Sequence, residues 1–561
     1  MGVILGFNAY IHDTAAALLI DGRLAAYCEQ ERLDRIKHTT AFPAQSIDFV
    51  LQQAGLSMDD VEDVSFYWDP MCGFGKRAWQ TIRSFPGSLR QLFDMQLSNF
   101  SKLRNVESFF RTKYNYRGRF HYVNHYLSHA AGAFYPSGFE DANILIADGN
   151  GEIATTWFGV GENTKITKIG EVYYPHSLGL LYCTVTEYLG FRQNSDEGKV
   201  MGLSAYGSNR FVQEFRKIVR VEPDGQIKTD LSYFDYHTSR KNWFSPKFAA
   251  IFGPARKAGE EIEDRHKDVA FACQRICEES IMEIVEILIR KTGKRRLVFS
   301  GGMALNCVLN GKLITEGVID DLYVPPPAYD AGASWGCALH VFHNRKPKAE
   351  RDLKPSVFMG PEFNAAQIES SLKNSGVAYE KPLDIIAATA GHIAAGKIVA
   401  RFDGRMEMGP RALGHRSILA DPSSEGMKDQ LNTRVKHRES FRPFGPSVLA
   451  ERAAELFNTK GRRSPYMLET YQINESWRKR LPAITHIDGT ARIQTVNQTD
   501  DPAYYAVIKA FDELTEIPCV LNTSFNVMGQ PIVNTPDEAV ECFLSTDIDV
   551  LAIGPFIVVK E

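Results

Sequence analysis

Short apolar segments separated by turn residues dominate the start of the chain. β-Prone apolar residues between polar turns predict two strands, at Val3–Asn8 and Ala15–Ile20. Asp21 and Gly22 form a typical hairpin turn, after which Arg23–Glu29 is predicted as a third strand. The opening of the chain is therefore predicted to be an antiparallel β-unit.

Related patterns recur further along. An apolar strand at 143–147 runs into an Asp-Gly turn, and the chain returns at 153–160. Another strand, Arg296–Ser300, runs into a pair of glycines. Helices are expected after a proline at 44–54 and, with apolar residues at three- and four-residue spacing, at 268–291. Strands that end in glycine turns and alternate with crossover helices predict an α/β fold with a site at the strand ends.

The composition changes in the second half. Residues 345–360 are charged and contain prolines, which is typical of a linker. Beyond them the chain has its own signals, including a helix at 385–395 and a strand at 398–402. We therefore expect two domains, 1–355 and 356–561.

Composition and charge exclude several classes of protein. The 561 residues are 44% hydrophobic and 11% aromatic, enough for large cores. Lys plus Arg is 64 and Asp plus Glu is 68, so a net charge of −4 gives no reason to expect a nucleic acid or an acidic membrane as partner. The nine cysteines form no C-x-x-C pair, and Cys273 and Cys277 fall in an apolar helical pattern that favours burial. With no long apolar run and no basic secretory segment at the start, we expect a cytoplasmic protein in a reducing compartment.

Two histidines four residues apart, His125 and His129, lie in a helix-compatible run. This spacing places both imidazoles on one helical face, within reach of one ion, although such pairs are often histidines without a ligand. Asp148 closes an apolar strand, and Asp330 precedes another apolar segment. Two histidines and two carboxylates from separate elements suit iron, manganese or zinc, with positions left for substrate oxygens.

Two polar stretches broken by glycines are candidate nucleotide sites. The segment 301–306 follows a strand, so its glycines could accept phosphate or ribose, and a tight turn is the alternative. The segment 197–202 offers a lysine that could meet a phosphate or could be solvated. The candidate residues are Glu197, Gly198, Lys199, Gly202, Gly301, Gly302 and Asn306.

A third candidate site lies in the C-terminal half. Residues 401–442 contain nine Lys or Arg and six Asp or Glu, and glycines and prolines interrupt the segment. This pattern favours a folded pocket for phosphates or carboxylates over a basic helix, with a solvated mixed-charge surface as the alternative. A polar turn is expected at 522–526, after an apolar strand. The candidate residues are Arg411, Arg416, Lys436, Arg438, Arg442, Arg492, Asn522, Ser524 and Asn526.

Several of these motifs occur together in one known family. They are residues 6–13 (GFNAYIHD), the charged run 29–38, the histidine pair, Asp148 with Gly149, and the segments 301–306, 404–419, 436–444 and 522–526. In this order they resemble the O-carbamoyltransferases of the NodU, CmcH and TobZ type. Such proteins have a TsaD-like N-terminal domain with the actin-like ATPase fold and a YrdC-like C-terminal domain. His415 stands where asparagine is the commonest form, a departure that leaves the cations intact.

The resemblance implies a two-step reaction. The C-terminal domain would convert carbamoyl phosphate and ATP, with Mg²⁺, to carbamoyl adenylate, with Arg416 and Lys436 as catalytic cations. The N-terminal domain would transfer the carbamoyl group to a hydroxyl of a small-molecule acceptor, such as an antibiotic, another natural product or a sugar. His12 is the candidate general base, and a packed histidine is the alternative.

The resemblance also implies the ligands of these steps. Fe²⁺ or another divalent transition metal would be held by the histidine pair, Asp148 and Asp330, and the segments 197–202 and 301–306 would hold the adenylate. The expected partners are ATP, carbamoyl phosphate and the hydroxylated acceptor, with a homodimer as one option.

Two other functions stay open. One is a threonylcarbamoyl-type tRNA modification enzyme, because both halves resemble components of that pathway, although the net charge weighs against tRNA. The other is an actin-like ATPase, which would release ADP and would leave the histidine pair unexplained. The identity of the nucleotide product, AMP or ADP, separates the classes.

Overall fold

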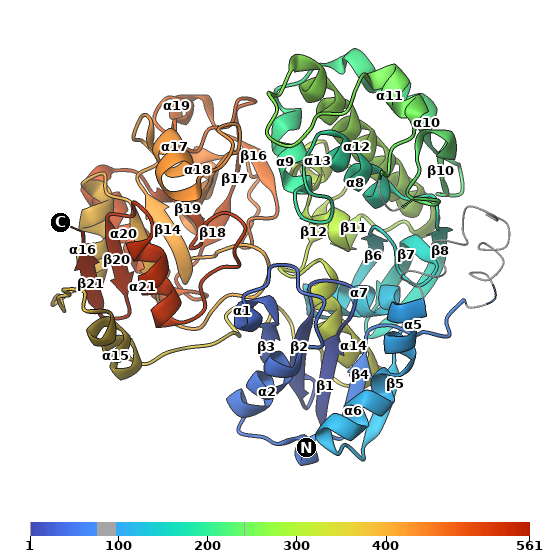
Figure 1. The fold of residues 1–561 in the computed structure, drawn as a ribbon, viewed down its shortest axis with the longest axis horizontal. Helices are drawn as coiled ribbons and strands as arrows, with labels where there is room; N and C mark the ends of the chain where they lie inside the picture. The colour runs from blue at the N-terminus through green and yellow to red at the C-terminus, as the bar shows by residue number, and fades with distance from the viewer. Residues whose placement is uncertain (1, 74, 76–96, 240–241, 561) are drawn as a thin grey trace. The chain divides into compact units, whose positions relative to one another are not determined.

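The computed structural model describes residues 2–73, 75, 97–239 and 242–560 (Figure 1). Its contacts divide the chain into two compact units. Unit 1 comprises Met1–Gln30, His38–Leu309 and Glu316–Pro355, and unit 2 comprises Glu31–Lys37, Asn310–Thr315 and Ser356–Glu561. A single linear boundary therefore misses two short segments that pack with unit 2.

The first sheet of unit 1 is built from the opening β-unit. Its strands are β1 (Val3–Asn8), β2 (Ala15–Ile20), β3 (Arg23–Glu29), β4 (Asp63–Phe66) and β5 (Arg119–Tyr122). β1, β2 and β3 pair antiparallel, whereas β4 and β5 add in parallel, giving the order β3-β2-β1-β4-β5. The three predicted strands and the predicted helix, α2 (Ala44–Gln53), are confirmed.

The second sheet of unit 1 repeats this topology. Its strands are β6 (Asp141–Ala147), β7 (Ala154–Glu162), β8 (Lys165–Tyr173), β11 (Arg296–Ser300) and β12 (Asp321–Tyr323). Their order, β12-β11-β6-β7-β8, again places three antiparallel strands beside two parallel ones. This duplicated order is the topology of the actin-like ATPase fold, so that expectation is confirmed for unit 1. The long predicted helix is α12 (Asp264–Thr292), and Cys273 and Cys277 are buried in it.

Two helices cross between the sheets of unit 1. α7 (His125–Phe134) follows the first sheet but packs on β6 and β11, whereas α14 (Asp330–Arg345) follows the second sheet but packs on β1, β2 and β4. The helices also pack on each other, and glycines permit the close approach: a Cβ on Gly336 would lie 1.8 Å from the carbonyl oxygen of Ser128. This crossing brings the first turns of both helices to the carboxyl end of β6.

Unit 2 is organised around a seven-stranded mixed sheet with the order β18-β15-β19-β14-β13-β20-β21. Its strands are β13 (Val399–Phe402), β14 (Arg416–Ala420), β15 (Gly445–Leu449), β18 (Gln494–Val496), β19 (Cys519–Ser524), β20 (Val550–Ile553) and β21 (Phe556–Val559). Its main helices are α15 (Ala365–Ser375), α16 (Ile385–Ala394), α20 (Pro502–Thr515) and α21 (Pro536–Leu544). The predicted helix and strand near residue 400 are confirmed.

One predicted turn of unit 2 is misplaced. β19 continues through Ser524 and pairs Asn522 with Leu419 and Ser524 with Ser417, so the polar residues at 522–524 belong to the strand. The polarity of these residues suggested a turn, but hydrogen bonds to the neighbouring strands override that local signal.

The chain contains further short elements. The helices are α1 (Glu31–Asp34), α5 (Leu97–Arg104), α6 (Val106–Tyr114), α8 (Leu178–Tyr188), α9 (Glu197–Ser204), α10 (Val212–Ile218), α11 (Pro246–Phe252), α13 (Cys307–Thr315), α17 (Met427–Gln430), α18 (Ala453–Leu456) and α19 (Glu475–Arg478). The strands are β9 (Val219–Val221), β10 (Ile227–Thr229), β16 (Thr470–Gln472) and β17 (Thr490–Arg492). Within the described ranges, no helix combines the length and apolar character needed to cross a bilayer.

Candidate functional site

Four buried side chains of unit 1 converge at the carboxyl end of β6. His125 and His129 lie on the first turns of α7, Asp148 follows β6, and Asp330 is the first residue of α14. Each offers one ligand atom, and these atoms all lie within 4.8 Å of one another. The structure thus brings together the four residues grouped from the sequence, which we call the His/Asp centre.

The spacing within the His/Asp centre suits a metal better than direct ion pairs. The Nε2 atom of His129 lies 3.6 Å from a carboxylate oxygen of Asp148 and 3.6 Å from one of Asp330. The Nε2 atom of His125 lies 3.4 Å and 4.0 Å from the same two oxygens. Ligand atoms held about 2.1 Å from a tetrahedral metal are about 3.4 Å apart. The four side chains therefore fit around a divalent transition metal.

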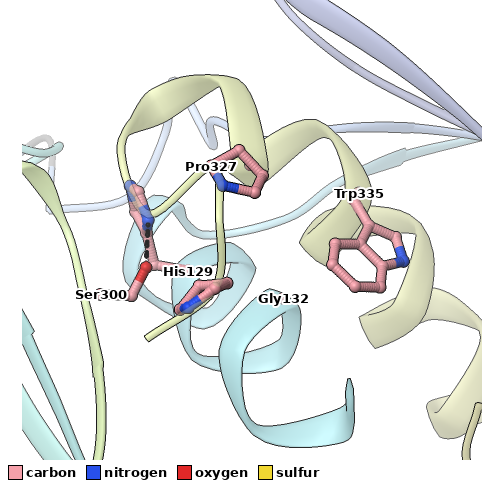
Figure 2. A pocket seen from close by; sticks show the side chains of 7 residues that line it. His129, Gly132, Ser300, Pro327 and Trp335 are labelled. Atoms are coloured by element: carbon pink, nitrogen blue, oxygen red, sulfur yellow. Dashed lines mark hydrogen bonds between the residues drawn. The ribbon is translucent and has the colours of Figure 1, made fainter. Parts of the chain in front are cut away.

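A hydrogen bond behind His129 fixes its tautomer. The Ser300 hydroxyl donates to the carbonyl oxygen of Ala328 at 2.9 Å, so its oxygen accepts the Nδ1–H of His129 at 3.1 Å. Figure 2 shows this bond beside a small pocket that is also lined by Pro327 and Trp335. The lone pair of His129 Nε2 consequently faces the carboxylates, as metal coordination requires.

Backbone groups orient the carboxylate of Asp148. Its Oδ1 accepts the N–H of Gly149 at 2.8 Å and that of Gly302 at 3.3 Å, while Oδ2 faces the histidines. Gly301 adopts φ +90°, and a Cβ there would lie 2.3 Å from the carbonyl oxygen of Ala147. The paired glycines therefore allow the turn to approach β6 and hold this carboxylate.

The first turn of α7 is fixed by a residue that the sequence reasoning missed. The buried carboxylate of Glu152 accepts the backbone N–H of His125 at 2.8 Å, the N–H of Asp69 at 3.1 Å and the side-chain amide of Asn124 at 2.9 Å. Asn124 in turn caps α7. Burial raises the pKa of Glu152. A glutamate after a glycine turn carries no recognisable signal, so only the fold reveals this role.

The charges within the His/Asp centre shift the pKa values of its members. Burial would lower the pKa of His125, but the carboxylates of Asp330 and Asp148 outweigh it and raise the value. Burial would raise the pKa of Asp148, but the hydrogen bond from His125 and the charge of His129 lower it. The carboxylate of Asp148 is thus held ionised at a largely buried position, which favours the binding of a cation.

His12 lies in the loop between β1 and β2. Its Nδ1 lies 2.7 Å from one oxygen of Asp13, and Nδ1 of His38 lies 2.7 Å from the other. Burial would lower the pKa of His12, but Asp330 and Asp13 raise it to about 10. The side chain remains 37% exposed, so it can exchange a proton with a ligand or with water.

The two candidate nucleotide stretches lie side by side in unit 1. Met201 Sδ, on α9, is 3.8 Å from Cys307 Sγ, directly after the glycine segment 301–306. The side chain of Asn306 exchanges two hydrogen bonds with Gln274, at 3.0 and 2.9 Å. Asn306 is therefore engaged in joining α12 to this segment.

The remaining residues of α9 have mixed surroundings. Gly202 is buried, whereas Gly198 is exposed with open space around it. Lys199 pairs with Asp196 at 3.2 Å, and Glu197 accepts the N–H of Asn194 at 2.6 Å. The exposed start of α9 leaves room for a ligand, and Lys199 would have to exchange its carboxylate partner for a phosphate.

In unit 2 the structure brings Lys436, Ser524 and Asn526 together. Lys436 ends a π-helical segment, Leu431–Lys436, and is 3% exposed. Its Nζ donates to the carbonyl oxygen of Ser524 and to the carbonyl and side-chain oxygens of Asn526, the latter two at 3.0 and 2.9 Å. None of these partners is a carboxylate. Burial and the charge of Arg438 hold the pKa of Lys436 well below its ordinary value.

Arginines act on Lys436 and on one another through their charges. Burial, with the charges of Arg442 and Arg492, holds the pKa of Arg438 well below its ordinary value. Arg438 donates from Nε to the amide oxygen of Asn432 at 2.8 Å. We call Lys436, Arg438, Arg442 and Arg492 the cation centre. Its members interact repulsively, so a phosphate group would relieve the repulsion.

Arg416 is placed differently from these cations. Its side chain is 0% exposed, and the guanidinium donates to the carbonyl oxygens of Asp403 at 2.7 Å and Pro361 at 3.2 Å while stacking 3.7 Å above the Phe402 ring. These contacts hold the loop before β14. Glu407, which the sequence reasoning missed, supports the same loop by accepting the backbone N–H groups of Leu413 at 2.7 Å and Arg416 at 3.2 Å.

Other candidates of unit 2 border this loop. Asn522 donates to Ser447 Oγ at 3.0 Å, while its Oδ1 is buried without a hydrogen-bond partner among the described residues. Arg411 is half-buried on the loop. His415 bridges the carbonyl oxygen of Arg405 at 2.6 Å and a carboxylate oxygen of Asp501 at 3.1 Å. The histidine that departs from the family pattern is therefore built into the loop.

Comparisons with known proteins agree with the expected family. The family model described as Carbamoyltransferase N-terminus matches residues 3–339, and Carbamoyltransferase C-terminus matches residues 390–560. The chain is 37% identical over 596 residues to the uncharacterized protein sll1178 of Synechocystis sp., covering 99% of this chain and 96% of that protein. It is 36% identical over 559 residues to the nodulation protein NolNO of Sinorhizobium fredii, covering 99% of this chain and 80% of the relative.

A solved structure is more distantly similar. Component A of the (R)-2-hydroxyglutaryl-CoA dehydratase of Acidaminococcus fermentans aligns at a TM-score of 0.33 and 14% identity, covering 62% of this chain and 100% of that one. That likeness is too weak to contribute to the assignment, which the two family models carry. The resemblance noted from the motifs is thus confirmed. This chain belongs to the carbamoyltransferase family of enzymes.

Proposed function

We propose that the protein is an ATP-dependent O-carbamoyltransferase that transfers a carbamoyl group to a hydroxyl of a small molecule. The observation that carries the proposal is the His/Asp centre, buried in a chain of the carbamoyltransferase family. An oxygen-binding metal site suits transfer to a hydroxyl, because a metal makes a bound oxygen more acidic or polarises a carbonyl. The alternative function, a plain actin-like ATPase, would not explain the four residues of the His/Asp centre.

The activation step belongs to unit 2 in this proposal. Carbamate nitrogen delocalises into its carbonyl, so the group needs a good leaving group such as AMP. The cation centre would bind the phosphates of carbamoyl phosphate and of ATP with its Mg²⁺. Water would cleave carbamoyl phosphate to carbamate and phosphate, and a carbamate oxygen would attack the α-phosphorus of ATP, so that carbamoyl adenylate forms and pyrophosphate leaves while the cations stabilise the developing charge. Lys436 is the strongest catalytic candidate there because it is buried and bonded to neutral oxygens. Arg416 would act indirectly, by holding the loop that shapes the site.

The transfer step belongs to unit 1. His125, His129, Asp148 and Asp330 would hold Fe²⁺ or another divalent transition metal, which supplies Lewis acidity when bound. Ser300 keeps the lone pair of His129 aimed at the centre, and Glu152 keeps the first turn of α7 in place. The segments 197–202 and 301–306 would hold the adenylate beside the centre. His12, bonded to Asp13, is the candidate general base for the acceptor hydroxyl, because a cation held by Asp330 would cancel the charge that raises the pKa of this histidine.

The acceptor class follows from the same features. A net charge of −4 gives no electrostatic reason for a nucleic-acid substrate, so we propose a hydroxylated natural product or sugar. All nine cysteines are free thiols, which agrees with a reducing, cytoplasmic setting.

The experiment that tests the proposal follows the nucleotide product. The purified protein, loaded with Fe²⁺, is incubated with ATP, Mg²⁺ and carbamoyl phosphate, and AMP and ADP are separated by chromatography. We expect AMP, released as carbamoyl adenylate hydrolyses in the absence of an acceptor, only when carbamoyl phosphate is present. ADP that forms equally well without carbamoyl phosphate would favour the actin-like ATPase alternative.

A further inference from the structure

Tyr67 is a buried residue that the proposed mechanism does not yet use. It directly follows the parallel strand β4, and its backbone N–H donates to the carbonyl oxygen of Phe7 at 3.4 Å. The side chain is 0% exposed, and within the described part of the chain its hydroxyl has no hydrogen-bond partner. Most buried polar groups in folded proteins are hydrogen-bonded, so a ligand that accepts a hydrogen bond would satisfy this hydroxyl.

The surroundings of Tyr67 place it at the His/Asp centre. Its ring meets the imidazole of His125 edge to face, with ring centroids 5.5 Å apart and planes inclined at 65°. The carboxylates that act on its hydroxyl are those of Asp330, Glu152, Asp148 and Asp13, two of which belong to the centre. Tyr67 therefore packs against His125, one of the four residues of the centre, and the charges of two others act on its hydroxyl.

Other buried tyrosines of unit 1 show the contrast. The hydroxyl of Tyr126, whose ring also contacts His125, donates to the carbonyl oxygen of Ala154 at 2.7 Å. The hydroxyl of Tyr188 donates to the carbonyl oxygens of Phe252 and Gly253 at 2.8 and 2.9 Å. These two hydroxyls complete the fold. The hydroxyl of Tyr67, in contrast, donates to no acceptor within the described part of the chain.

We propose that Tyr67 donates its hydroxyl hydrogen to an oxygen atom of the ligand held at the His/Asp centre. This inference rests on the proposed function, in which the centre holds a metal with an oxygen ligand. A phenol hydroxyl is a hydrogen-bond donor at neutral pH, so Tyr67 would favour oxygen ligands that can accept, such as a carbamoyl carbonyl or an acceptor hydroxyl. Tyr67 would then orient this oxygen and help select it.

The test uses Co²⁺ as the metal and acetate as the oxygen ligand. The full-length protein is titrated with Co²⁺ and then with acetate, and both affinities are read from the visible d–d absorption. Tyr67→Phe keeps the ring but removes the hydroxyl. We expect unchanged Co²⁺ affinity, about 3- to 10-fold weaker acetate binding, and an unfolding temperature without ligand that is equal or higher. Tyr188→Phe, the control, should bind both ligands normally but unfold at a lower temperature.

The outcomes separate this inference from the proposed function. Equal acetate affinity in the wild type and Tyr67→Phe, at equal Co²⁺ loading, would overturn the inference alone. Loss of Co²⁺ binding in Tyr67→Phe would also overturn it, because the tyrosine would then hold the metal and not its ligand. If the wild type took up no Co²⁺, or His129→Ala bound it equally well, the metal centre itself would be wrong and both proposals would fall.

Discussion

The His/Asp centre of unit 1 combines two carboxylates with two imidazoles, whereas the cation centre of unit 2 combines the buried Lys436 with three half-buried arginines. In unit 1 two carboxylates face two imidazoles at 3.4 to 4.0 Å, too far apart for strong direct hydrogen bonds. In unit 2 Lys436 bonds to neutral oxygens, and Arg438 lies within the field of Arg442 and Arg492. The first centre therefore offers imidazole and carboxylate ligand atoms, and the second offers cations that repel one another.

The two sets of residues suit different ligands. Burying a charge without a partner costs several kcal/mol, so folded proteins rarely do it unless a ligand completes the site. We propose that a cation completes the His/Asp centre and that phosphate completes the cation centre. Opposite ligands suit opposite steps: phosphate chemistry in unit 2 and metal-assisted transfer in unit 1.

The largest effect is expected from removing an imidazole of the His/Asp centre. In His129→Ala the metal loses one of four ligands and its orienting bond through Ser300, so affinity should fall by more than ~100-fold with the fold retained. Metal content after dialysis, measured by mass spectrometry, checks this. His392→Ala, on helix α16 of unit 2, is the control and should retain full occupancy. Full occupancy in His129→Ala would show that the histidine pair is not a metal site.

The next effect tests the cation centre. Lys436→Met should reduce the rate of carbamoyl-adenylate formation by about 100- to 1000-fold, since a buried charge facing the phosphates is removed. Without ligand the unfolding free energy should fall by only about 1 kcal/mol, because relief from burying a charge offsets the loss of the donor to the oxygens of Ser524 and Asn526. Urea unfolding and a burst assay measure the two quantities. A large loss of stability with normal adenylate formation would make Lys436 a structural residue.

Arg416→Ala sharpens the contrast between a binding cation and a structural one. Removing its guanidinium leaves buried carbonyl oxygens of the loop without donors, so unfolding free energy should fall by about 3 kcal/mol. Arg463→Ala breaks an exposed ion pair with Asp500 and should cost less than ~1 kcal/mol. Urea titrations of both variants provide the comparison. Equal stability of Arg416→Ala and the wild type would mean that the guanidinium is free to serve a ligand.

A smaller loss of metal affinity is expected when a residue that orients a metal ligand is changed. Ser300→Ala removes the acceptor of the His129 Nδ1–H but keeps the imidazole, so metal affinity should fall by about 10- to 100-fold. Competition with a chelator of known affinity measures the change. Unchanged affinity would show that the tautomer of His129 is fixed by something other than Ser300.

Sequence reasoning grouped the four residues of the His/Asp centre but could not show why they meet. The hairpin signals and helical spacing are local, and they placed the first three strands correctly. The close crossing of α7 and α14 depends on Gly336 packing against Ser128, a contact between segments about 200 residues apart. The only sign of this long-range packing in the sequence is a glycine, and a single glycine does not predict a helix contact.

In the C-terminal half, residues that the sequence grouped by type have different surroundings in the structure. Arg416 and Lys436 look alike in a list of cations, yet Arg416 is bonded to backbone carbonyls and Lys436 faces Ser524 and Asn526. Asn522 looked like a turn residue but pairs within β19. Burial and hydrogen-bond partners, which separate these roles, are set by tertiary structure and not by local sequence.

The central claim is that the two centres serve separate half-reactions, and a burst assay on two variants tests it directly. His129→Ala and Lys436→Met are each mixed with radiolabelled ATP, Mg²⁺ and carbamoyl phosphate, quenched within one turnover, and analysed for carbamoyl adenylate. We predict a near wild-type burst from His129→Ala and at least a ~100-fold slower burst from Lys436→Met. If His129→Ala blocked adenylate formation as completely as Lys436→Met, the separation of the two centres would be contradicted.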